Sequence, residues 1–151
     1  MIKKNPDELV PRSISDILQN IDRFLVVEAL SDGKIIGTVS WAALPEIGSA
    51  RHPSVEIKTL SVDTGWRKRG IGCKLVQRAI RRVKSLRPEQ IVVLTFTPAF
   101  FKTMGFVEVP KEKLMYKLYT GCLNCTKYDS PFTCPEVAMS LQLKYTDGSK
   151  A

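Results

Sequence analysis

A glycine-bearing turn stands between a strand-like segment and an amphipathic helix, and this order constrains the fold more than any other feature of the chain. The turn reads Arg67-Lys68-Arg69-Gly70-Ile71-Gly72, and residues 54–62 before it have strand character. Apolar residues recur after it at helical spacing, namely Leu75, Val76, Ala79, Ile80, Val83 and Leu86. The free N–H groups and positive dipole end of a helix N-terminus attract anions. Since Gly70 and Gly72 let phosphate oxygens approach the main chain, the sequence predicts a pyrophosphate site here.

The glycine spacing excludes two other phosphate-binding loops. A Walker loop reads Gly-x-x-x-x-Gly-Lys-Ser/Thr, whereas here Cys73 and Lys74 follow Gly72. The dinucleotide-binding fingerprint Gly-x-Gly-x-x-Gly requires a third glycine where this chain has Leu75. The pattern that remains is Arg-x-x-Gly-x-Gly. Because many glycine-rich loops simply turn the chain, the strand that precedes the turn has to be weighed with it.

That strand contains a shift in its apolar alternation. Apolar residues fall at Val55 and Ile57 and then at Leu60 and Val62, so the phase slips by one position at Lys58-Thr59. A strand with period-2 alternation keeps its core face buried through such a slip only if an extra residue is accommodated. The pattern therefore predicts a β-bulge just upstream of the phosphate turn. Two short strands, or a half-buried Thr59, are the alternatives.

Length and composition indicate an ordinary globular protein. We expect the 151 residues to form a single domain over 1–151, with frayed tails at about 1–8 and 146–151. Apolar residues make up 44% and charged residues 25%, and no apolar run approaches the roughly 20 residues of a membrane span. No signal-like region follows Met1, so we expect a cytoplasmic protein without a membrane partner, with reduced or metal-bound thiols.

The net charge of +8 raises the question of nucleic acid as a partner. Much of the basic excess surrounds the phosphate turn and the exposed face of its helix: Arg67, Lys68, Arg69, Lys74, Arg78, Arg81, Arg82, Lys84 and Arg87. The sequence shows no interleaved aromatic platform and no helix-turn-helix pattern. A polyanionic cofactor and an acidic small-molecule substrate explain the charge at least as well, so nucleic acid is the disfavoured partner.

The remaining elements can be placed coarsely. A short helix from Ser13 or Ser15 to Asp22 is expected to bury Ile14, Ile17, Leu18 and Ile21. Strands are expected at 24–30 and 35–44, joined by a hairpin at Asp32-Gly33, and then at 91–96, from 106 and at 136–143, with a loop at 45–53. A helix opens at Thr97-Pro98 and closes at Gly105. Strand–helix–strand around the turn implies a right-handed parallel crossover, so the class is α/β with a mixed sheet.

The bulged strand, the Arg-x-x-Gly-x-Gly turn and the segment Ala99 to Phe106 together resemble the GCN5-related N-acetyltransferase (GNAT) fold. Further motifs are similar to short, single-domain N-acetylglutamate synthase-like amino-acid N-acetyltransferases, which serve the first step of arginine biosynthesis. These motifs are Leu9–Ser13, Glu56–Val62, the Phe100-Phe101 pair, and Cys-x-x-Cys followed by Cys-x-Glu-Val-Ala-Met, over roughly residues 9–143. The loop at 45–53 looks like an insertion relative to that family.

The resemblance implies a cofactor and a place for it. Acetyl-CoA would insert its pantetheine arm between two parallel strands that the bulge splays apart. The resemblance assigns the following residues to the cofactor: Leu60, Ser61, Val62, Arg67, Lys68, Arg69, Gly70, Ile71, Gly72, Cys73, Lys74 and Phe101. A backbone N–H near Leu60 can face the thioester oxygen. Transfer to the amine would then be direct, in a ternary complex, and would require no metal.

Acyl transfer requires a base for the attacking amine, and Glu56 is the candidate. Glu56 alternates away from Val55 and Ile57, and it would act through a water. A solvated or salt-bridged carboxylate is the alternative. Many acetyltransferases place a tyrosine acid where this chain has Phe101, so no side chain there can protonate the thiolate. Phe100 and Phe101 would pack on the pantetheine arm or in the core.

Glutamate carries two carboxylates, so a glutamate pocket needs paired cations. Arg12 matches a substrate-binding arginine of the relatives, and Lys58 and Lys117 are further candidates. For each of the three, a plain surface cation is the alternative. The rival functions are acetylation of another small-molecule or protein amine and an acyl-CoA-binding module without catalysis. The sequence is compatible with a homodimer.

The cysteines are a separate feature. Cys122, Cys125 and Cys134 share one segment, but a structural zinc site needs four ligands, and the one histidine, His52, lies far from them in sequence. A dithiol pair or plain buried thiols are the simpler interpretations, so no metal is assigned. Cys73 has no neighbouring base in the sequence and is expected to pack as a small apolar residue.

Overall fold

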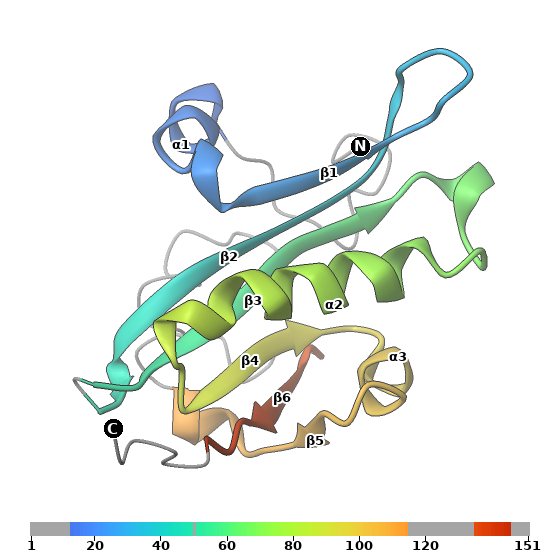
Figure 1. Cartoon of the computed structure of the whole chain (residues 1–151). Helices are drawn as coiled ribbons and strands as arrows, with labels where there is room; N and C mark the ends of the chain where they lie inside the picture. Colours follow the sequence, from blue (N-terminus) through green and yellow to red (C-terminus); the bar gives the residue numbers. More distant parts are fainter. Residues whose placement is uncertain (1–12, 50, 115–134, 146–151) are drawn as a thin grey trace.

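The computed structural model describes residues 13–49, 51–114 and 135–145. Within them a mixed sheet has the strand order β1-β2-β3-β4-β6-β5 (Figure 1). The strands are β1 (Phe24–Glu28), β2 (Ile35–Gly48), β3 (Pro53–Val62), β4 (Gln90–Thr95), β5 (Val107–Glu108) and β6 (Val137–Gln142). The pair β3–β4 is parallel, and every other neighbouring pair is antiparallel. The predicted mixed α/β class is confirmed.

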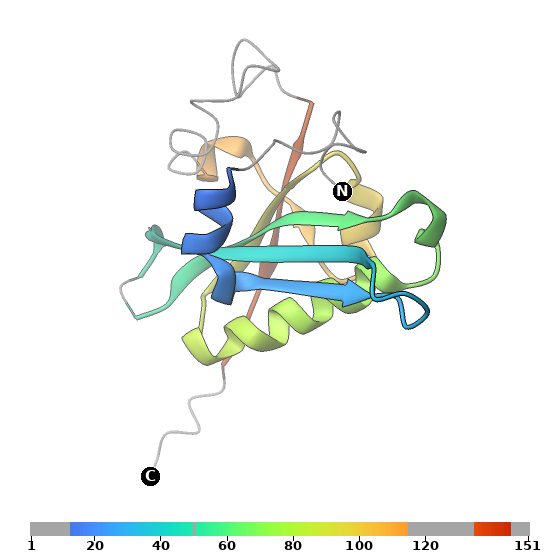
Figure 2. The ribbon, with the colours of Figure 1, turned by 90° about the horizontal axis from the view of Figure 1, so that it is seen from above.

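The helices are α1 (Ile14–Gln19), α2 (Ile71–Val83) and α3 (Pro98–Lys102). One-turn 3-10 helices lie at Ile21–Arg23, Thr64–Trp66, Lys84–Leu86 and Lys111–Leu114. The helix α2 connects β3 to β4, which is the expected parallel crossover, and Figure 2 shows it lying along one side of strands β1 to β3. None of the helices in the described ranges is long and apolar enough to cross a membrane.

The apolar face of α2 forms the main core with the sheet. Leu75, Val76, Ala79 and Val83 are buried against residues of β2, β3, β4 and β6. In β2, Gly37 allows the close approach of α2, because a Cβ at that position would lie 3.0 Å from Leu75 Cδ1. A second, smaller cluster contains Leu44, Val92, Leu114 and Ala138.

Three expectations about packing and boundaries were wrong. The helix α1 ends at Gln19, and the side chains of Ile14, Leu18 and Ile21 are 77%, 64% and 60% exposed. Ile21 belongs to the following 3-10 helix, so the expected continuous inner face does not form. Leu86 is 48% exposed because the α-helix ends at Val83 and a tighter 3-10 turn rotates the later residues away from the core.

The third correction concerns residues 45–53, which were expected to form a loop. The strand β2 continues through Pro45 to Gly48, and Gly48 pairs with Pro53 at the start of β3. The pairing of β1 with β2 ends at Ser40, so β2 has no neighbour on that side at Pro45. The register between β2 and β3 also shifts between Leu44 and Gly48, and proline is tolerated at such edge and irregular positions. Residues 45–53 therefore belong to an extended β2–β3 hairpin.

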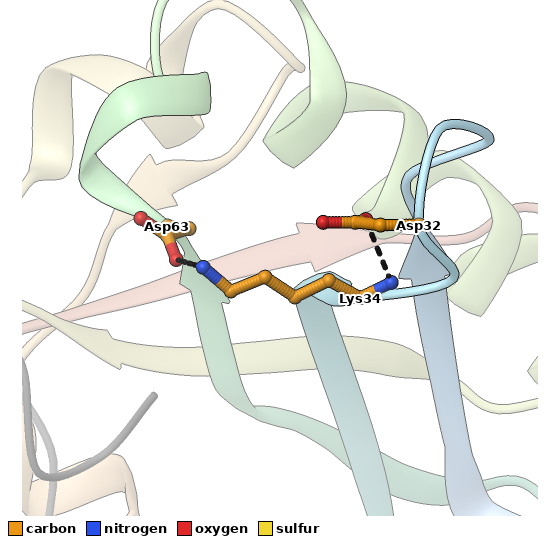
Figure 3. A network of polar contacts seen from close by, with 3 residues as sticks. All are labelled: Asp32, Lys34 and Asp63. Carbon is orange, nitrogen blue, oxygen red and sulfur yellow. Dashed lines mark hydrogen bonds and ion pairs between the residues drawn. The ribbon is translucent and has the colours of Figure 1, made fainter.

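The predicted Asp-Gly hairpin joins β1 to β2. Gly33 has a φ of 69°, and the Lys34 N–H donates to Asp32 Oδ1 at 3.1 Å. Figure 3 shows Lys34 reaching from this hairpin to Asp63, with 3.7 Å between Nζ and Oδ2. Asp63 directly follows β3, so the ion pair links the hairpin to the start of the segment that leads into the glycine turn. Lys34 is exposed and Asp63 is half-buried, and a pair with one solvent-exposed partner contributes about 0–1 kcal/mol.

Candidate active site

The predicted bulge is present in β3. Thr38 of β2 pairs with Ser61, and Ser40 pairs with Lys58, so β3 has one residue more than β2 between these two pairs. Thr59 has a φ of 56°, in the left-handed region that β-branched residues rarely adopt. The extra residue explains the slip in apolar alternation, because Leu60 and Val62 return to the core side that Val55 and Ile57 occupy.

The parallel strands β3 and β4 pair over only two positions. Val55 pairs with Ile91 and Glu56 with Val92, although β3 continues to Val62 and β4 to Thr95. Beyond Glu56 the two strands therefore diverge, and this is the splay that the resemblance implied. Diverging strands turn main-chain N–H and C=O groups toward a gap, where an extended ligand can pair with them as an added strand does.

The glycine turn leads into α2 in the geometry of an anion site. Gly70 is the N-cap residue with a φ of 78°, and the Lys74 N–H donates to its carbonyl oxygen at 3.1 Å. The N–H groups of residues 71–73 precede this first helical bond and so have no acceptor within the helix. Lys68 has a φ of 62°. Left-handed residues on both sides of Arg69 curve the main chain into a concave arrangement of the kind that binds anions.

The two glycines of the turn have different roles. No atom lies within 4 Å of a Cβ placed on Gly70, so this glycine is required by its positive φ and faces open space. A Cβ on Gly72 would lie 3.3 Å from Cζ of Phe100 and 3.8 Å from Cγ2 of Val62. Gly72 therefore allows α3 to pack closely on the first turn of α2. The sequence argument assigned phosphate approach to both glycines and missed this contact.

Two arginines of the turn also hold the turn in place. Arg67 Nε donates to the carbonyl oxygen of Val62 at 3.1 Å, and the Arg69 guanidinium lies 4.9 Å from the centre of the Trp66 ring. Each guanidinium carries further N–H donors. The side chains of Lys68 and Lys74 are exposed. The turn is thus basic, and it is fixed to the end of β3.

Glu56 lies at the last paired position of β3 and β4 and is 4% exposed. Its cross-strand partner is Ala42, and two residues along each strand Lys58 pairs with Ser40. Directly paired residues share a face of the sheet. Glu56 and the half-buried Lys58 therefore share one face, whereas Val55 and Ile57 on the other face belong to the core under α2. The predicted orientation of Glu56 is confirmed; its catalytic role stays a prediction.

A hydrogen-bonded group joins the strands below the splay. Gln90 of β4 donates through Nε2 to Ser54 Oγ of β3 at 3.0 Å, and its Oε1 accepts from Ser140 Oγ of β6 at 2.7 Å. Ser54 and Ser140 are both buried. This group, the Gln90 clamp, ties three strands together, and its Ser54–Gln90 bond lies just before the first β3–β4 pair, Val55 with Ile91. Sequence reasoning missed it because single polar residues in strands give no pairing signal.

The aromatic pair of α3 divides between core and surface. Phe101 is 3% exposed and meets Phe106 edge to face at 5.3 Å between ring centres. Phe100 is half-buried and contacts Gly72 at the start of α2. Phe100 is thus the more accessible ring at the turn, and the assignment of Phe101 to the cofactor stays a prediction. Cys73 in the first turn of α2 is a free, half-buried thiol.

Several predicted residues lie outside the described part of the chain, namely Arg12, Lys117, Cys122, Cys125 and Cys134. Among the residues that are described, no three His, Cys, Asp or Glu side chains gather as metal ligands would. His52 directly precedes β3, at the opposite end of the strand from the bulge, and its Nδ1 is 2.8 Å from the carbonyl oxygen of Arg87. Burial raises the pKa of Tyr145 beside it, and the nearby Arg87 charge partly opposes the shift.

Comparison with known proteins is consistent with this geometry. Residues 3–106 match the model of the acetyltransferase (GNAT) family. An uncharacterized N-acetyltransferase of Chlorobaculum tepidum is 31% identical over 131 residues, which is 87% of this chain and 77% of the relative. An amino-acid acetyltransferase of Mycobacterium tuberculosis is 26% identical over 126 residues, 80% of this chain and 66% of the relative.

A solved structure shares the fold. It is N-acetylglutamate synthase from Neisseria gonorrhoeae, complexed with coenzyme A and N-acetyl-glutamate, and it superposes with a TM-score of 0.72 at 18% identity. The match covers 95% of this chain but 31% of that longer one. At this level of identity the likeness shows the fold.

Proposed function

This chain belongs to the acetyltransferase (GNAT) family, and on that premise we propose that it acetylates the α-amine of an amino acid, with L-glutamate as the acceptor. Family membership makes it an acetyl-CoA-dependent N-acetyltransferase. The finer proposal is direct transfer in a ternary complex, as the first step of arginine biosynthesis. The observation that carries it is the divergence of β3 from β4 directly after Glu56, which puts a buried carboxylate at the closed end of the cofactor gap.

In this proposal the cofactor follows the geometry of the turn. The pyrophosphate lies over the N–H groups of residues 71–73, with the side chains of Lys68, Arg67 and Arg69 around it. The pantetheine arm pairs with the main chain of β3 in the gap. The half-buried apolar side chains of Leu60, Val62 and Ile71 lie on the core side of that path. The thioester then lies near the bulge, between the turn and Glu56.

The chemistry needs one base and one oxyanion donor. The α-ammonium of the acceptor loses a proton to Glu56 through a water, and the free amine attacks the thioester carbonyl. A main-chain N–H near Leu60 stabilises the oxyanion of the tetrahedral intermediate. The attacking nitrogen loses its second proton to water, the carbon–sulfur bond breaks and the thiolate leaves. Solvent protonates the thiolate, because Phe101 replaces the tyrosine that serves as the acid in other family members.

Charge favours an acidic acceptor. Lys58 shares the face of Glu56 and lies two residues nearer the bulge, where it can pair with a carboxylate of the acceptor. Arg12 and Lys117 are proposed as the further cations. Two of the three named relatives support this direction, since one is an amino-acid acetyltransferase and another was solved with N-acetyl-glutamate. A cationic amine such as a polyamine would need acidic side chains in the positions that these cations occupy.

The test is acetyl-CoA turnover, followed by thiol release, against a panel of amino acids and amines. We expect turnover that depends on L-glutamate and falls at least about 10-fold in Arg12→Ala, as the loss of a charged contact to a carboxylate requires. Arg81→Ala, on the exposed face of α2, is the matched control and should behave as wild type. Turnover with a different amine, or acetyl-CoA binding with no acceptor dependence, would remove the glutamate assignment.

A further inference from the structure

A side-chain contact joins β2 to the bulge of β3. Ser40 of β2 is 3% exposed, and its Oγ lies 3.2 Å from the Lys58 carbonyl oxygen and 3.0 Å from Thr59 Oγ1. A hydroxyl has one proton and two lone pairs, so when Ser40 donates to the carbonyl, the Thr59 hydroxyl supplies the proton of the second bond. Lys58 is the last residue of β3 in regular register with β2 before the bulge, and Thr59 is the first residue out of register.

Thr59 needs such support. Its φ of 56° is left-handed, a conformation that glycine and asparagine adopt readily but a β-branched residue does not. No sequence rule would place a threonine there. A residue persists in this conformation only where its surroundings over-determine it, and such residues cluster at functional sites. The Ser40 hydroxyl, fixed by a central strand on one side and bonded to the bulge on the other, supplies that constraint.

The conformations that β3 could adopt without the Ser40 contact differ mainly at the bulge, which lies in the candidate active site. If the extra residue were expelled from the ladder, Leu60 and Val62 would turn from the core under α2 to the opposite face. Because both pack against that core, the strand as a whole keeps its register. What remains free to vary is the main chain at residues 58–60 itself. This stretch lies two to four residues past the last β3–β4 pair at Glu56, in the part of β3 that has diverged from β4.

We propose that Ser40 is a positioning residue for acetyl transfer. By holding Thr59 in the left-handed conformation, it fixes the main chain of the bulge in the geometry that meets the thioester, before the cofactor binds. Ser40 touches neither cofactor nor acceptor and acts through Thr59. The inference rests on the acetyl-CoA dependence of the family and not on the identity of the acceptor, so its test stands apart from the glutamate assignment.

A double-mutant cycle tests this route. Ser40→Ala removes the contact, and Thr59→Gly installs a residue that adopts positive φ without support. We expect Ser40→Ala to lower kcat by roughly 10- to 100-fold, as small misplacements of reacting groups do, while CoA affinity changes less than about 3-fold because the turn is untouched. Thr59→Gly should retain most activity. The double variant should stay close to Thr59→Gly, because glycine adopts the positive φ without the Ser40 contact and only the bond to the Lys58 carbonyl is then lost.

The matched control is Ser140→Ala, which removes another buried hydroxyl bond in the same sheet. It should lower the melting temperature and leave kcat unchanged, which separates positioning from general stability. The acceptor for these assays is whichever amine supports turnover. Hydrogen exchange of the peptide that covers residues 57–62 gives a readout without any acceptor: it should be faster in Ser40→Ala and should return toward the wild-type rate in the double variant.

The inference is overturned if Ser40→Ala keeps wild-type kcat and exchange rates, or if the double variant is as impaired as Ser40→Ala. If Ser40→Ala does not fold, the test becomes whether the double variant folds. A folded, active double variant would then support the route through Thr59, and a double variant that also fails to fold would refute it.

Discussion

Substitution of the two glycines of the turn separates their roles. In Gly70→Ala, a residue with a Cβ must adopt a φ of 78°, which costs about 1–2 kcal/mol. The lower entropy of the unfolded alanine chain offsets about 0.4–1 kcal/mol of this. The net loss of unfolding free energy is about 1 kcal/mol, which for a chain of this length lowers the melting temperature by about 2–4 °C.

Gly72→Ala should behave differently. Alanine is better than glycine within a helix by up to about 1 kcal/mol. The new Cβ lies 3.3 Å from Cζ of Phe100, so the half-buried ring has to move by a few tenths of an ångström. These terms oppose each other, and we expect the unfolding free energy of Gly72→Ala to stay within about 0.5 kcal/mol of wild type.

Thermal unfolding with and without CoA measures both effects. The Cβ of Gly70→Ala enters the open space beside the anion site, so the stabilisation that CoA adds should shrink for this variant. Gly72→Ala should keep more of that stabilisation, because its Cβ meets Phe100 on the other side. A Gly70→Ala variant as stable as wild type, or a Gly72→Ala variant less stable than Gly70→Ala, would refute this division of roles.

Further outcomes follow from the same structure. Glu56→Gln should lower kcat by about 100-fold or more with little change in CoA affinity, measured by thiol release and calorimetry; unchanged kcat would exclude Glu56 as the base. Gln90→Leu should lower the melting temperature by breaking the clamp, and unchanged melting would show that the clamp is not stabilising. Lys34→Ala should lower the free energy of unfolding, measured by denaturant titration, by less than about 1 kcal/mol, and by a smaller amount at high salt. Burial raises the pKa of Tyr145 from its ordinary value of 10.0, so the contribution of Tyr145 to the free energy of unfolding is complete below pH 10.0 and falls as the pH rises further. In Tyr145→Phe, the free energy of unfolding measured with denaturant should therefore fall less steeply above pH 10.0.

Much of the active-site region was predictable because its signals are local. Leu60 and Val62 can lie on the same face as Val55 and Ile57 only if the strand holds an extra residue between them. The structure has that residue in the bulge at Thr59. The glycine pattern and the apolar face of α2 predicted the turn and the crossover, and Asp32-Gly33 predicted the hairpin. These features depend on residues that are close in sequence.

The errors arose where tertiary context decides. The spacing of Ile14, Leu18 and Ile21 describes an amphipathic face, but it does not say whether a partner surface lies opposite. Pro45 signals a loop only when its strand has neighbours on both sides. The contacts of Gly72 with Phe100 and of Ser40 with Thr59 join segments that lie apart in sequence, and no single-chain pattern encodes them.

The proposed reaction is acetyl transfer from acetyl-CoA to the α-amine of glutamate at the splayed strands. It can be followed directly by mass spectrometry of the products formed from acetyl-CoA and L-glutamate, with released thiol counted in the same reaction. The proposed reaction yields N-acetylglutamate and free CoA in equal amounts, both lost together in Glu56→Gln. Thiol release without acetylated glutamate, or acetylation of a different amine under the same conditions, would contradict it.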